Sequence, residues 1–368
     1  MVHFVIVIDK SFQIKFSQLL LAWYRKNARI LPWRETSDPY AIWISEIMLQ
    51  QTRVDTVIPY YHKWLEEFPT VEDLATADED RVLKVWEGLG YYSRARNLHK
   101  AAHILVDRFQ GQLPRDLKDL QSLPGVGRYT AGAIASIAFG IPAPILDGNL
   151  RRVLTRFFNI RTPIQTTETE KRLWKLAGEL LPPNNPGDFN QALMELGALV
   201  CLPINPNCAD CPLNKECQAN QLGIQESLPV RKEKSPPPHY QVAAAVIEKE
   251  GQVLLAKRPP DGLLGGLWEF PGGKQEEAET LPEALRREIQ EELDLEIVVG
   301  EALGTFQHAY THYSVTLHAF RCREIQGDIQ LNYHTDVSWV EPDNLDAYPM
   351  GKLDRMIAEQ LQDSPSST

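Results

Sequence analysis

Apolar residues recur at helical spacing through the N-terminal part of the chain. Between residue 11 and about residue 220 they fall three and four positions apart, with short polar breaks between segments. The segments with this spacing are 16–27, 39–68, 79–89, 94–109, 130–140, 150–158, 169–181 and 188–201. Glycine or proline interrupts the pattern at 88–90, 123–125 and 182–186. The pattern predicts an all-α domain.

The pattern changes after a proline- and charge-rich stretch at 226–238. Beyond it, strand-like runs occupy 241–249, 252–258, 315–322 and 337–341, and helical spacing returns at 281–294 and 351–361. We therefore expect an all-α domain (1–225), a linker (226–238), an α+β domain (239–361) and a disordered tail (362–368). A chain of 368 residues is long enough for two such cores.

Charge is distributed unevenly between the two parts. The net charge is −11, but residues 1–240 carry 28 Lys and Arg against 26 Asp and Glu, whereas residues 241–368 carry 10 against 23. The total therefore does not exclude nucleic acid as a partner of the first part, since phosphate contacts need only a local basic patch.

The sequence has no apolar run long enough for a membrane span, and its opening MVHFVIVIDK lacks a basic leader and a cleavage site. We expect a cytoplasmic protein with no membrane partner.

Four of the five cysteines crowd into one loop. Cys201, Cys208, Cys211 and Cys217 are separated by six, two and five residues. In a reducing compartment this clustering indicates a metal site rather than disulfides. Zinc is one candidate, although zinc sites usually pair two Cys-x₂-Cys knuckles across a longer insert. Cys322 stands alone in a strand-like run and is expected to be a buried apolar residue.

Three features of the first part could support chemistry on a nucleic acid. Gly125 and Gly127, in LPGVG, form a tight turn before a helix, where bare backbone N–H groups can bind phosphate; an ordinary helix corner is the alternative. Asp147 follows an apolar run and precedes a helix, as a helix-capping aspartate would. Glu46 lies on a largely apolar helix, where burial would raise its pKa, although the position alone favours a partly exposed or ion-paired glutamate.

A separate carboxylate group lies in the second part. On the predicted helix 281–294, Glu288, Glu291 and Glu292 fall at i, i+3 and i+4 and so share one face. With Glu279 they could supply an oxygen-rich site for Mg²⁺. A solvated acidic face is the alternative.

The order of these motifs resembles one enzyme family. LPGVGRYTA, then LDGN, then Cys-x₆-Cys-x₂-Cys-x₅-Cys is similar to the helix–hairpin–helix DNA glycosylases with an iron–sulfur loop, and within them to the MutY-type adenine DNA glycosylases. The resemblance runs from about Phe12 to Cys217 and continues into the second part. It implies a multidomain protein with an all-α helix–hairpin–helix glycosylase domain, whose iron–sulfur loop is 201–217, followed by an α+β Nudix-fold domain.

The resemblance also implies an activity, a cofactor and a partner. Family members act in base excision repair and remove adenine mispaired with 8-oxoguanine, or with guanine, from double-stranded DNA. They hold a [4Fe–4S] cluster on four cysteine thiolates. We expect the same activity, cofactor and DNA partner here, in a monomer.

The catalytic roles follow by resemblance at matching positions. Glu46 corresponds to the acid that protonates adenine N7, and Asp147 to the carboxylate that stabilises the cationic sugar. Tyr129 and Asn149 are the supporting groups. Bifunctional glycosylase/lyases of the endonuclease III type carry a lysine nucleophile where this chain has Tyr129, so we expect excision without efficient strand cleavage.

Further residues correspond to those that contact DNA in the family. The adenine pocket would comprise Arg29, Leu31, Trp33 and Gln191; the residues wedged into the duplex or touching the lesion would be Gln51, Tyr91 and Thr52. Without the family, core packing explains Trp33 and Tyr91 equally well.

The second domain departs from its relatives at two places. Relatives read 8-oxoguanine with a Phe-Ser-His element, whereas this chain has Gln307 between Phe306 and His308. The Nudix box, Gly-x₅-Glu-x₇-Arg-Glu-aliphatic-x-Glu-Glu-x-Gly, matches everywhere except its last glycine, which is Asp294. Aspartate adopts the positive φ expected there less readily than glycine does.

The leading hypothesis is a monofunctional adenine DNA glycosylase, with Nudix nucleotide hydrolysis as a possible second activity. Three alternatives stay open. They are an endonuclease III-like glycosylase/AP lyase, a nucleotide-pyrophosphate hydrolase with a DNA-binding domain, and a lesion-binding protein without catalysis, which the presence of both Glu46 and Asp147 disfavours.

Overall fold

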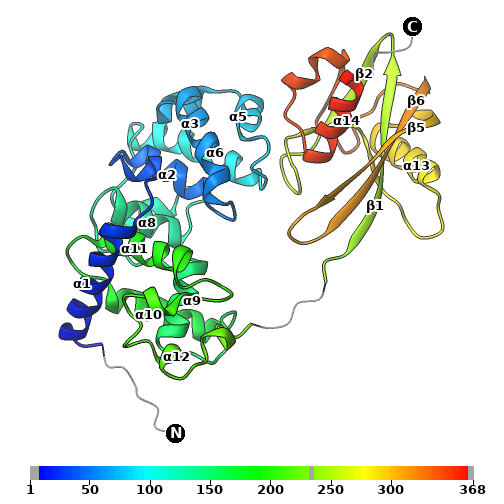
Figure 1. The fold of residues 1–368 in the computed structure, drawn as a ribbon. Helices are drawn as coiled ribbons and strands as arrows, with labels where there is room; N and C mark the ends of the chain where they lie inside the picture. Colours follow the sequence, from blue (N-terminus) through cyan, green and yellow to red (C-terminus); the bar gives the residue numbers. More distant parts are fainter. Residues whose placement is uncertain (1–7, 232–235, 364–368) are drawn as a thin grey trace. The chain divides into compact units, whose positions relative to one another are not determined.

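The computed structural model describes residues 8–231 and 236–363 (Figure 1). The chain divides into two compact units: Met1–Ala75 with Lys100–Lys234, and Thr76–His99 with Ser235–Thr368. The division at 234/235 falls inside the expected linker. The segment Thr76–His99 groups with the C-terminal unit, although the helical pattern assigned it to the first domain.

The N-terminal part is helical, as the apolar spacing predicts. Its elements are α1 (Lys10–Asn27), η1 (Pro32–Arg34), α2 (Pro39–Met48), α3 (Val54–Glu67), α4 (Val71–Thr76), α5 (Glu79–Trp86), α6 (Ser93–Phe109), α7 (Leu117–Gln121), α8 (Arg128–Ile137), α9 (Gly148–Phe157), α10 (Thr167–Leu180), α11 (Pro186–Leu199), η2 (Cys208–Asp210), α12 (Gln218–Gln221) and η3 (Gln225–Ser227). In the described part of the chain, no helix has both the length and the apolar character needed to cross a membrane.

One predicted helix is two helices. The apolar pattern joined residues 39–68, but α2 ends at Met48 and α3 begins at Val54. Gln51, between them, has a left-handed backbone with φ 58°. The break contains neither glycine nor proline, and α2 and α3 both bury apolar faces, so the spacing gives no warning of it.

One hydrophobic core of the helical unit lies between α1, α9, α10 and α11. Phe16 of α1, Phe157 of α9 and Phe189 of α11 meet there, and the rings of Phe16 and Phe157 pack edge to face at 5.1 Å. Burial of such aromatic side chains is the main source of stability in a domain of this kind. The core fixes the mutual positions of α9 and α11, which bring several predicted site residues together.

The C-terminal part is built on a mixed sheet. Its strands are β1 (His239–Lys249), β2 (Gln252–Lys257), β3 (Trp268–Glu269), β4 (Gly272–Lys274), β5 (Glu296–Ala309), β6 (Ser314–Gln326) and β7 (Asp336–Val340). The strand order is β3-β2-β1-β6-β5, β4 pairs with β1, and β7 pairs with β2. Only β1 and β6 run parallel among the pairs described. The sequence pattern missed β5, a long strand in which only Ile297 and Phe306 are buried.

Two helices cover opposite faces of this sheet. Ala243 and Ala245 of β1 pack in the core that contains α13 (Leu281–Leu293), whereas Ala244 and Val246 pack in the core that contains α14 (Lys352–Asp363). Alternate side chains of a strand point to opposite faces, so the apolar run of β1 serves both cores. A short helix, η4 (Pro342–Ala347), precedes α14.

The expected domain ends need correction. Residues 226–231 are not an exposed linker: Leu228 is buried, Arg156 donates a hydrogen bond to its carbonyl (2.9 Å), and Ile164 N–H donates to the Val230 carbonyl (3.1 Å). Backbone bonding and one apolar side chain outweigh the charges that suggested a tether. Helix α14 also continues to Asp363, two residues into the expected tail. The rest of that tail, 364–368, lies outside the described residues.

Asp294 occupies the position that the Nudix pattern gives to glycine. It ends α13 with a left-handed backbone (φ 55°, ψ 33°), and its N–H donates to the Gln290 carbonyl. The Gln290 side-chain amide donates to Asp294 Oδ1 at 2.6 Å. The sequence therefore predicts the backbone conformation correctly, and a local hydrogen bond helps aspartate to adopt it.

Candidate active site

One pocket of about 780 Å³ in the helical unit gathers most of the predicted site residues. Its walls come from the loop before η1, α2, the turn before α8, the start of α9, and α11. The predicted residues that line it are Arg29, Leu31, Trp33, Glu46, Gln51, Thr52, Gly125, Gly127, Tyr129, Asp147, Asn149 and Gln191. Residues 160 positions apart in sequence thus share one cavity.

Glu46 is buried at the wall of this pocket. Its helix, α2, packs so closely that nine of its ten residues are buried, and Glu46 itself is only 5% exposed. Burial raises the pKa of Glu46 to about 7, although the Tyr129 hydroxyl donates a hydrogen bond to Glu46 Oε2 (2.9 Å) and opposes the shift. A carboxyl group in this state can hold a proton near neutral pH. The partly exposed glutamate that the sequence allowed is excluded.

Asp147 is held at the N-terminus of α9. It is the N-cap, and Asp147 Oδ1 accepts from Leu150 N–H at 2.7 Å. Asp147 Oδ2 accepts from the Asn149 amide at 2.9 Å. Burial raises the pKa of Asp147, while these hydrogen bonds oppose the rise. The side chain therefore caps the helix, as the sequence suggested, and also lines the pocket, while its catalytic role stays a prediction.

Hydrogen bonds connect Asp147 to the cysteine loop. Asn149, which binds Asp147, accepts through Oδ1 from Arg152 Nη2 at 2.8 Å. Arg152 in turn donates to the carbonyl of Gly197 (2.7 Å) and, through Nε, to that of Cys201 (2.6 Å). Arg152 is buried, so these bonds are shielded from water.

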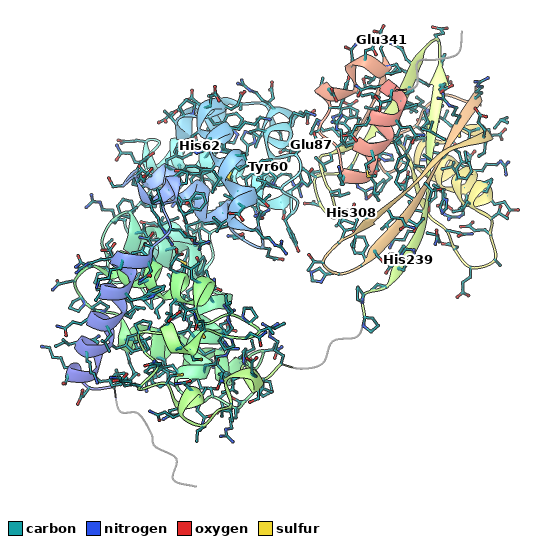
Figure 2. All side chains as sticks on the ribbon, viewed as in Figure 1. Tyr60, His62, Glu87, His239, His308 and Glu341 are labelled. Atoms are coloured by element: carbon teal, nitrogen blue, oxygen red, sulfur yellow. The ribbon has the colours of Figure 1, made fainter. Side chains whose placement is uncertain are left out.

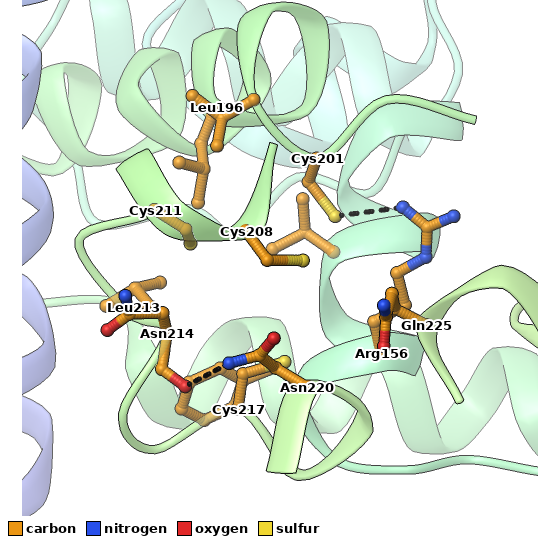
Figure 3. Close-up of a pocket in the computed structure, with 13 residues that line it drawn as sticks. Arg156, Leu196, Cys201, Cys208, Cys211, Leu213, Asn214, Cys217, Asn220 and Gln225 are labelled. Carbon is orange, nitrogen blue, oxygen red and sulfur yellow. Dashed lines mark hydrogen bonds between the residues drawn. The ribbon is translucent and has the colours of Figure 1, made fainter. Parts of the chain in front are cut away.

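Four cysteine side chains line one small cavity below α9 and α11 (Figure 3). Cys201, Cys208, Cys211 and Cys217 are all free thiols, and their neighbours include Leu196 and Leu213. Burial raises the pKa of Cys211 to about 12 and that of Cys217 to about 11. These thiols are therefore protonated near neutral pH, and a bound metal would have to displace their protons.

A buried arginine also faces the cysteines. Arg156 Nη1 lies 3.4 Å from Cys201 Sγ, and its other N–H groups donate to the Leu202, Pro203 and Leu228 carbonyls. The positive charge of Arg156 would stabilise the cysteines as negatively charged thiolates, which is the form that binds a metal.

A buried ion pair of Glu195 with Arg29 and Arg34 forms part of the pocket wall, next to the residues assigned to adenine. Glu195 of α11 is fully buried and accepts from Arg29 Nε (2.9 Å), Arg29 Nη2 (2.8 Å) and Arg34 Nη2 (2.9 Å). Burial alone would raise its pKa, but the two arginines lower the pKa of Glu195 to about 2. Trp33 is buried and packs edge to face on Tyr61 at 5.5 Å, so it belongs to the core as well as to the pocket.

Arg34, Met194 and Glu195 line the pocket but were not identified from the sequence. Arg34 directly follows Trp33, and Glu195 lies one turn after Gln191 on the same face of α11. That spacing was the available signal for Glu195. Met194, three residues after Gln191, has a similar spacing signal, and its Sδ lies 3.2 Å from Tyr129 Oη.

The turn before α8 has the predicted open geometry. Gly125 has φ 77°, where glycine is favoured, and Gly127 is the N-cap of α8 without a side-chain cap. Both glycines line the pocket, so the first amide groups of α8 lie beside it. A helix N-terminus of this kind favours phosphate.

Two residues assigned to the DNA wedge share an uncommon backbone. Gln51 has φ 58° and Tyr91 has φ 50°, and both are exposed. Left-handed non-glycine residues concentrate at functional loops, because the strain must be held by the surrounding fold. Thr52 is half-buried next to Gln51. Tyr91 belongs to the second unit and does not line the pocket.

Gln307 and His308 lie on β5 of the second unit, and His308 is labelled in Figure 2. Phe306 is buried in the core beneath α14, and adjacent residues of a strand alternate, so Gln307 faces away from the side of Phe306 and His308. The His308 ring packs edge to face on Tyr310 at 4.5 Å, and burial lowers the pKa of His308. The structure thus separates these two predicted lesion contacts onto opposite faces.

The Nudix-box carboxylates surround an arginine. Arg287 Nη2 lies 2.8 Å from Glu279 Oε1, and its Nη1 lies 3.1 Å from Glu288 Oε1 and 3.3 Å from Glu291 Oε2. A side chain at Gly273 would collide with Glu288, which explains the glycine. Glu292 turns instead toward buried His334 (Oε2 to Nε2 3.9 Å), and burial raises its pKa to about 8.

Within residues 8–231 and 236–363, no group of three or more His, Cys, Asp or Glu side chains is arranged to hold a single metal ion.

Comparison with known proteins identifies both parts. Residues 44–179 match the HhH-GPD superfamily of base excision DNA repair proteins, and residues 242–360 match the NUDIX domain. The predicted fold class, a helix–hairpin–helix glycosylase domain followed by a Nudix-fold domain, is confirmed.

Similar proteins include adenine DNA glycosylases from animals and bacteria. The human enzyme is 40% identical over 83% of this chain, which spans 66% of its length. The enzyme of Buchnera aphidicola from Acyrthosiphon pisum is 38% identical over 81% of this chain and 83% of its own. Among solved structures, a thermostable thymine-DNA glycosylase is 32% identical, with a TM-score of 0.53 over 57% of this chain and 97% of its own.

The ion-pair group gives the first prediction. Glu195→Gln removes the partner of two arginines, so we expect the free energy of unfolding at neutral pH to fall by roughly 3 kcal/mol, as for other broken buried pairs. Because the folded pKa of Glu195 is depressed to about 2, its contribution is present above its unfolded pKa and is lost as pH falls from about 4.5 toward 2. Urea unfolding of wild type and variant over that range measures this.

The difference between the two proteins should therefore shrink at acid pH. A constant difference would contradict the assigned ion pair. Glu179→Gln is a matched control, since Glu179 pairs at 3.6 Å with an exposed lysine, and exposed pairs contribute little.

Proposed function

The chain belongs to the adenine DNA glycosylase family, and from that premise we propose that it hydrolyses the N-glycosidic bond of adenine mispaired with 8-oxoguanine, or with guanine, in double-stranded DNA. The observation that supports this most strongly is the pocket that holds a protonatable Glu46 and a hydrogen-bonded Asp147 together. A purine needs a proton to leave, and the sugar it leaves behind needs a negative charge.

The pocket has the features required to hold an extruded base. Leu31 and Trp33 supply apolar and aromatic surface, while Arg29 and Gln191 supply polar groups for the base edge. Arg29 is fixed by Glu195, so its guanidinium is held in place before the base arrives. A base flipped out of the duplex can be read in such a site by stacking and hydrogen bonds.

Glu46 acts as the general acid in this proposal. Its proton passes to N7 of adenine, the C1′–N9 electron pair leaves with the base, and water adds to the sugar. Burial supports the role because it keeps Glu46 protonated near neutral pH. Tyr129 hydrogen-bonds to Glu46 and so orients the carboxyl group.

Asp147 stabilises the positive charge that develops on the sugar. Asn149 and Leu150 N–H hold its carboxylate at the N-cap, which fixes both oxygens before the reaction. Tyr129 occupies the position of the lysine of the lyase class, so this site supplies no amine there for a Schiff base. An endonuclease III-like lyase is the alternative, and strand cleavage without alkali would reveal it.

The remaining predicted contacts position the DNA. The amide groups after Gly125 and Gly127 would bind a phosphate, Gln51 and Tyr91 would enter the duplex, and Thr52 would contact the lesion. In the Nudix-fold domain we propose His308 as a lesion contact, with Gln307 on the other face of β5 contributing only if DNA reaches both faces.

A [4Fe–4S] cluster is proposed as the resident cofactor. Cys201, Cys208, Cys211 and Cys217 would hold it, and it would act by ordering the loop that they form. Zinc on the same thiols is the alternative. Arg156 and Arg152 join this loop to α9, so ordering the loop also positions Asn149.

The Nudix box is proposed to serve first as the scaffold of the lesion-reading domain. Arg287 already pairs with Glu279, Glu288 and Glu291, and Gly273 packs against Glu288, so several box residues have structural partners. Hydrolysis of a nucleoside triphosphate with Mg²⁺ at Glu279, Glu288, Glu291 and Glu292 is the alternative. We further propose that the protein is a cytoplasmic monomer.

The catalytic assignment predicts a specific pH dependence. Glu46 must be protonated to act, so single-turnover excision from an A:8-oxoguanine duplex should fall as pH rises through about 7. Glu46→Gln should lower the rate by roughly 10²–10⁴-fold while lesion binding is kept, because the amide preserves shape but donates no proton to the base. Abasic sites are detected by strand breakage in alkali.

Asp147→Asn should also lose excision of adenine and retain DNA binding. As a substrate control, a G:T duplex should remain uncut by the wild-type protein. Near-normal excision by Glu46→Gln would mean that another group is the acid.

The cysteine assignment predicts a coloured protein. Purified protein should be brown, with about four irons per chain, as expected for one [4Fe–4S] cluster on four thiolates. Cys211→Ser should reduce iron content and DNA affinity more than it reduces the excision rate of bound substrate. A colourless protein with zinc would establish the alternative.

The scaffold assignment of the Nudix box predicts no pyrophosphate release. Full-length protein supplied with 8-oxo-dGTP and Mg²⁺ should leave the nucleotide intact, since the guanidinium of Arg287 already pairs with three of the carboxylates and would compete with the cation for them. Glu291→Gln should match wild type. Pyrophosphate release that disappears in Glu291→Gln would instead show that the box is a second active site.

A further inference from the structure

The Tyr129 hydroxyl faces two acceptors but carries one proton. Its oxygen lies 2.9 Å from Glu46 Oε2 and 3.2 Å from Met194 Sδ. A phenol has a single O–H, and both a carboxylate oxygen and a thioether sulfur can accept from it. The hydroxyl can therefore serve only one of these two partners at a time.

The protonation state of Glu46 decides which partner is favoured. An ionised carboxylate is the stronger acceptor and attracts the hydroxyl proton. A protonated carboxyl group is a weaker acceptor and can itself donate to the phenol oxygen. The Tyr129 hydroxyl can then donate its hydrogen bond to Met194. In a pocket wall shielded from water, a hydroxyl donor that has an acceptor is more stable than one that has none.

We propose that Met194 is a positioning residue for the general acid, because its thioether accepts a hydrogen bond from the Tyr129 hydroxyl while Glu46 is protonated. The hydrogen bond from Tyr129 to Glu46 then strengthens only as Glu46 gives up its proton to the base. An interaction that grows during proton transfer lowers the barrier, whereas one already present in the ground state does not. This inference rests on the proposed role of Glu46.

The charged groups around Glu46 do not prevent Tyr129 from switching its hydrogen bond between Glu46 and Met194. The groups that face Glu46 are Tyr129 from α8, Asp147 from the start of α9, and Arg34 from η1. Asp147 favours the protonated acid, and Arg34 favours the ionised one. Arg34 forms an ion pair with Glu195, which follows Met194 on α11. This ion pair therefore also holds the segment of α11 that places Met194 Sδ beside Tyr129.

A purely apolar role for Met194 is the competing explanation. Met194 packs against the helical core, as many methionines do. Leucine would satisfy that role with little cost, since Met and Leu have similar volumes. The two explanations therefore differ in the pH dependence of excision rather than in stability.

The experiment is single-turnover excision from an A:8-oxoguanine duplex by full-length wild type, Met194→Leu and Met194→Gln, across the titration of Glu46. Leucine leaves Tyr129 with Glu46 as its acceptor and so favours the ionised acid. We expect the fall in rate to move to lower pH by roughly half a unit to one unit. The rate at acid pH should decrease as well, because the hydrogen bond from Tyr129 to Glu46 is then already present before proton transfer. Glutamine, whose amide oxygen can accept the proton, should keep the wild-type profile.

A second background separates this role from general disturbance of the pocket. Tyr129→Phe removes the shared proton, so adding Met194→Leu to it should shift the profile no further. An unchanged profile in Met194→Leu, or an equal shift in the Tyr129→Phe background, would overturn the inference and leave the proposed function standing. Absence of excision by wild type would overturn the proposed function itself.

Discussion

Burial of carboxyl groups in one pocket is the constraint on which the helical unit depends. An ionised carboxylate taken out of water is costly unless it is neutralised or paired. Glu46 is accommodated by holding its proton, with its pKa raised to about 7. Asp147 is accommodated by hydrogen bonds at a helix N-cap, and Glu195 by two arginines that lower its pKa to about 2. Three chemically similar groups are thus accommodated in three different ways: by a retained proton, by helix-capping hydrogen bonds and by a buried ion pair.

The cysteine loop takes part in this arrangement although it lies outside the pocket. Arg152 reaches from Asn149 to the carbonyl of Cys201, and Arg156 binds carbonyls on both sides of the loop. The position of the loop therefore bears on the orientation of the Asp147 carboxylate. An ordered loop and a correctly placed Asp147 are two consequences of the same set of buried arginines.

The second unit shows how a sequence motif can have a structural role. The Nudix box is nearly complete, yet Arg287 is engaged by three carboxylates and Gly273 gives room to Glu288. Asp294 adopts the left-handed backbone expected of the glycine it replaces, with help from Gln290. These contacts explain why the motif fits the fold, and a nucleotide assay must decide its chemistry.

The sequence by itself determined what is local. Apolar spacing predicted the helices, the cysteine spacing placed four thiols in one loop, and LPGVG predicted the open turn before α8. It did not separate α2 from α3, because the break at Gln51 contains no residue that forbids a helix, and it missed β5, most of which is not buried. Only the tertiary structure decided that residues 226–231 pack on the helical unit, that Arg34 and Arg29 meet Glu195, and that Tyr129 lies between Glu46 and Met194. These pairings join residues far apart in the chain, and no local pattern encodes them, since each depends on how separate elements of the helical unit pack together.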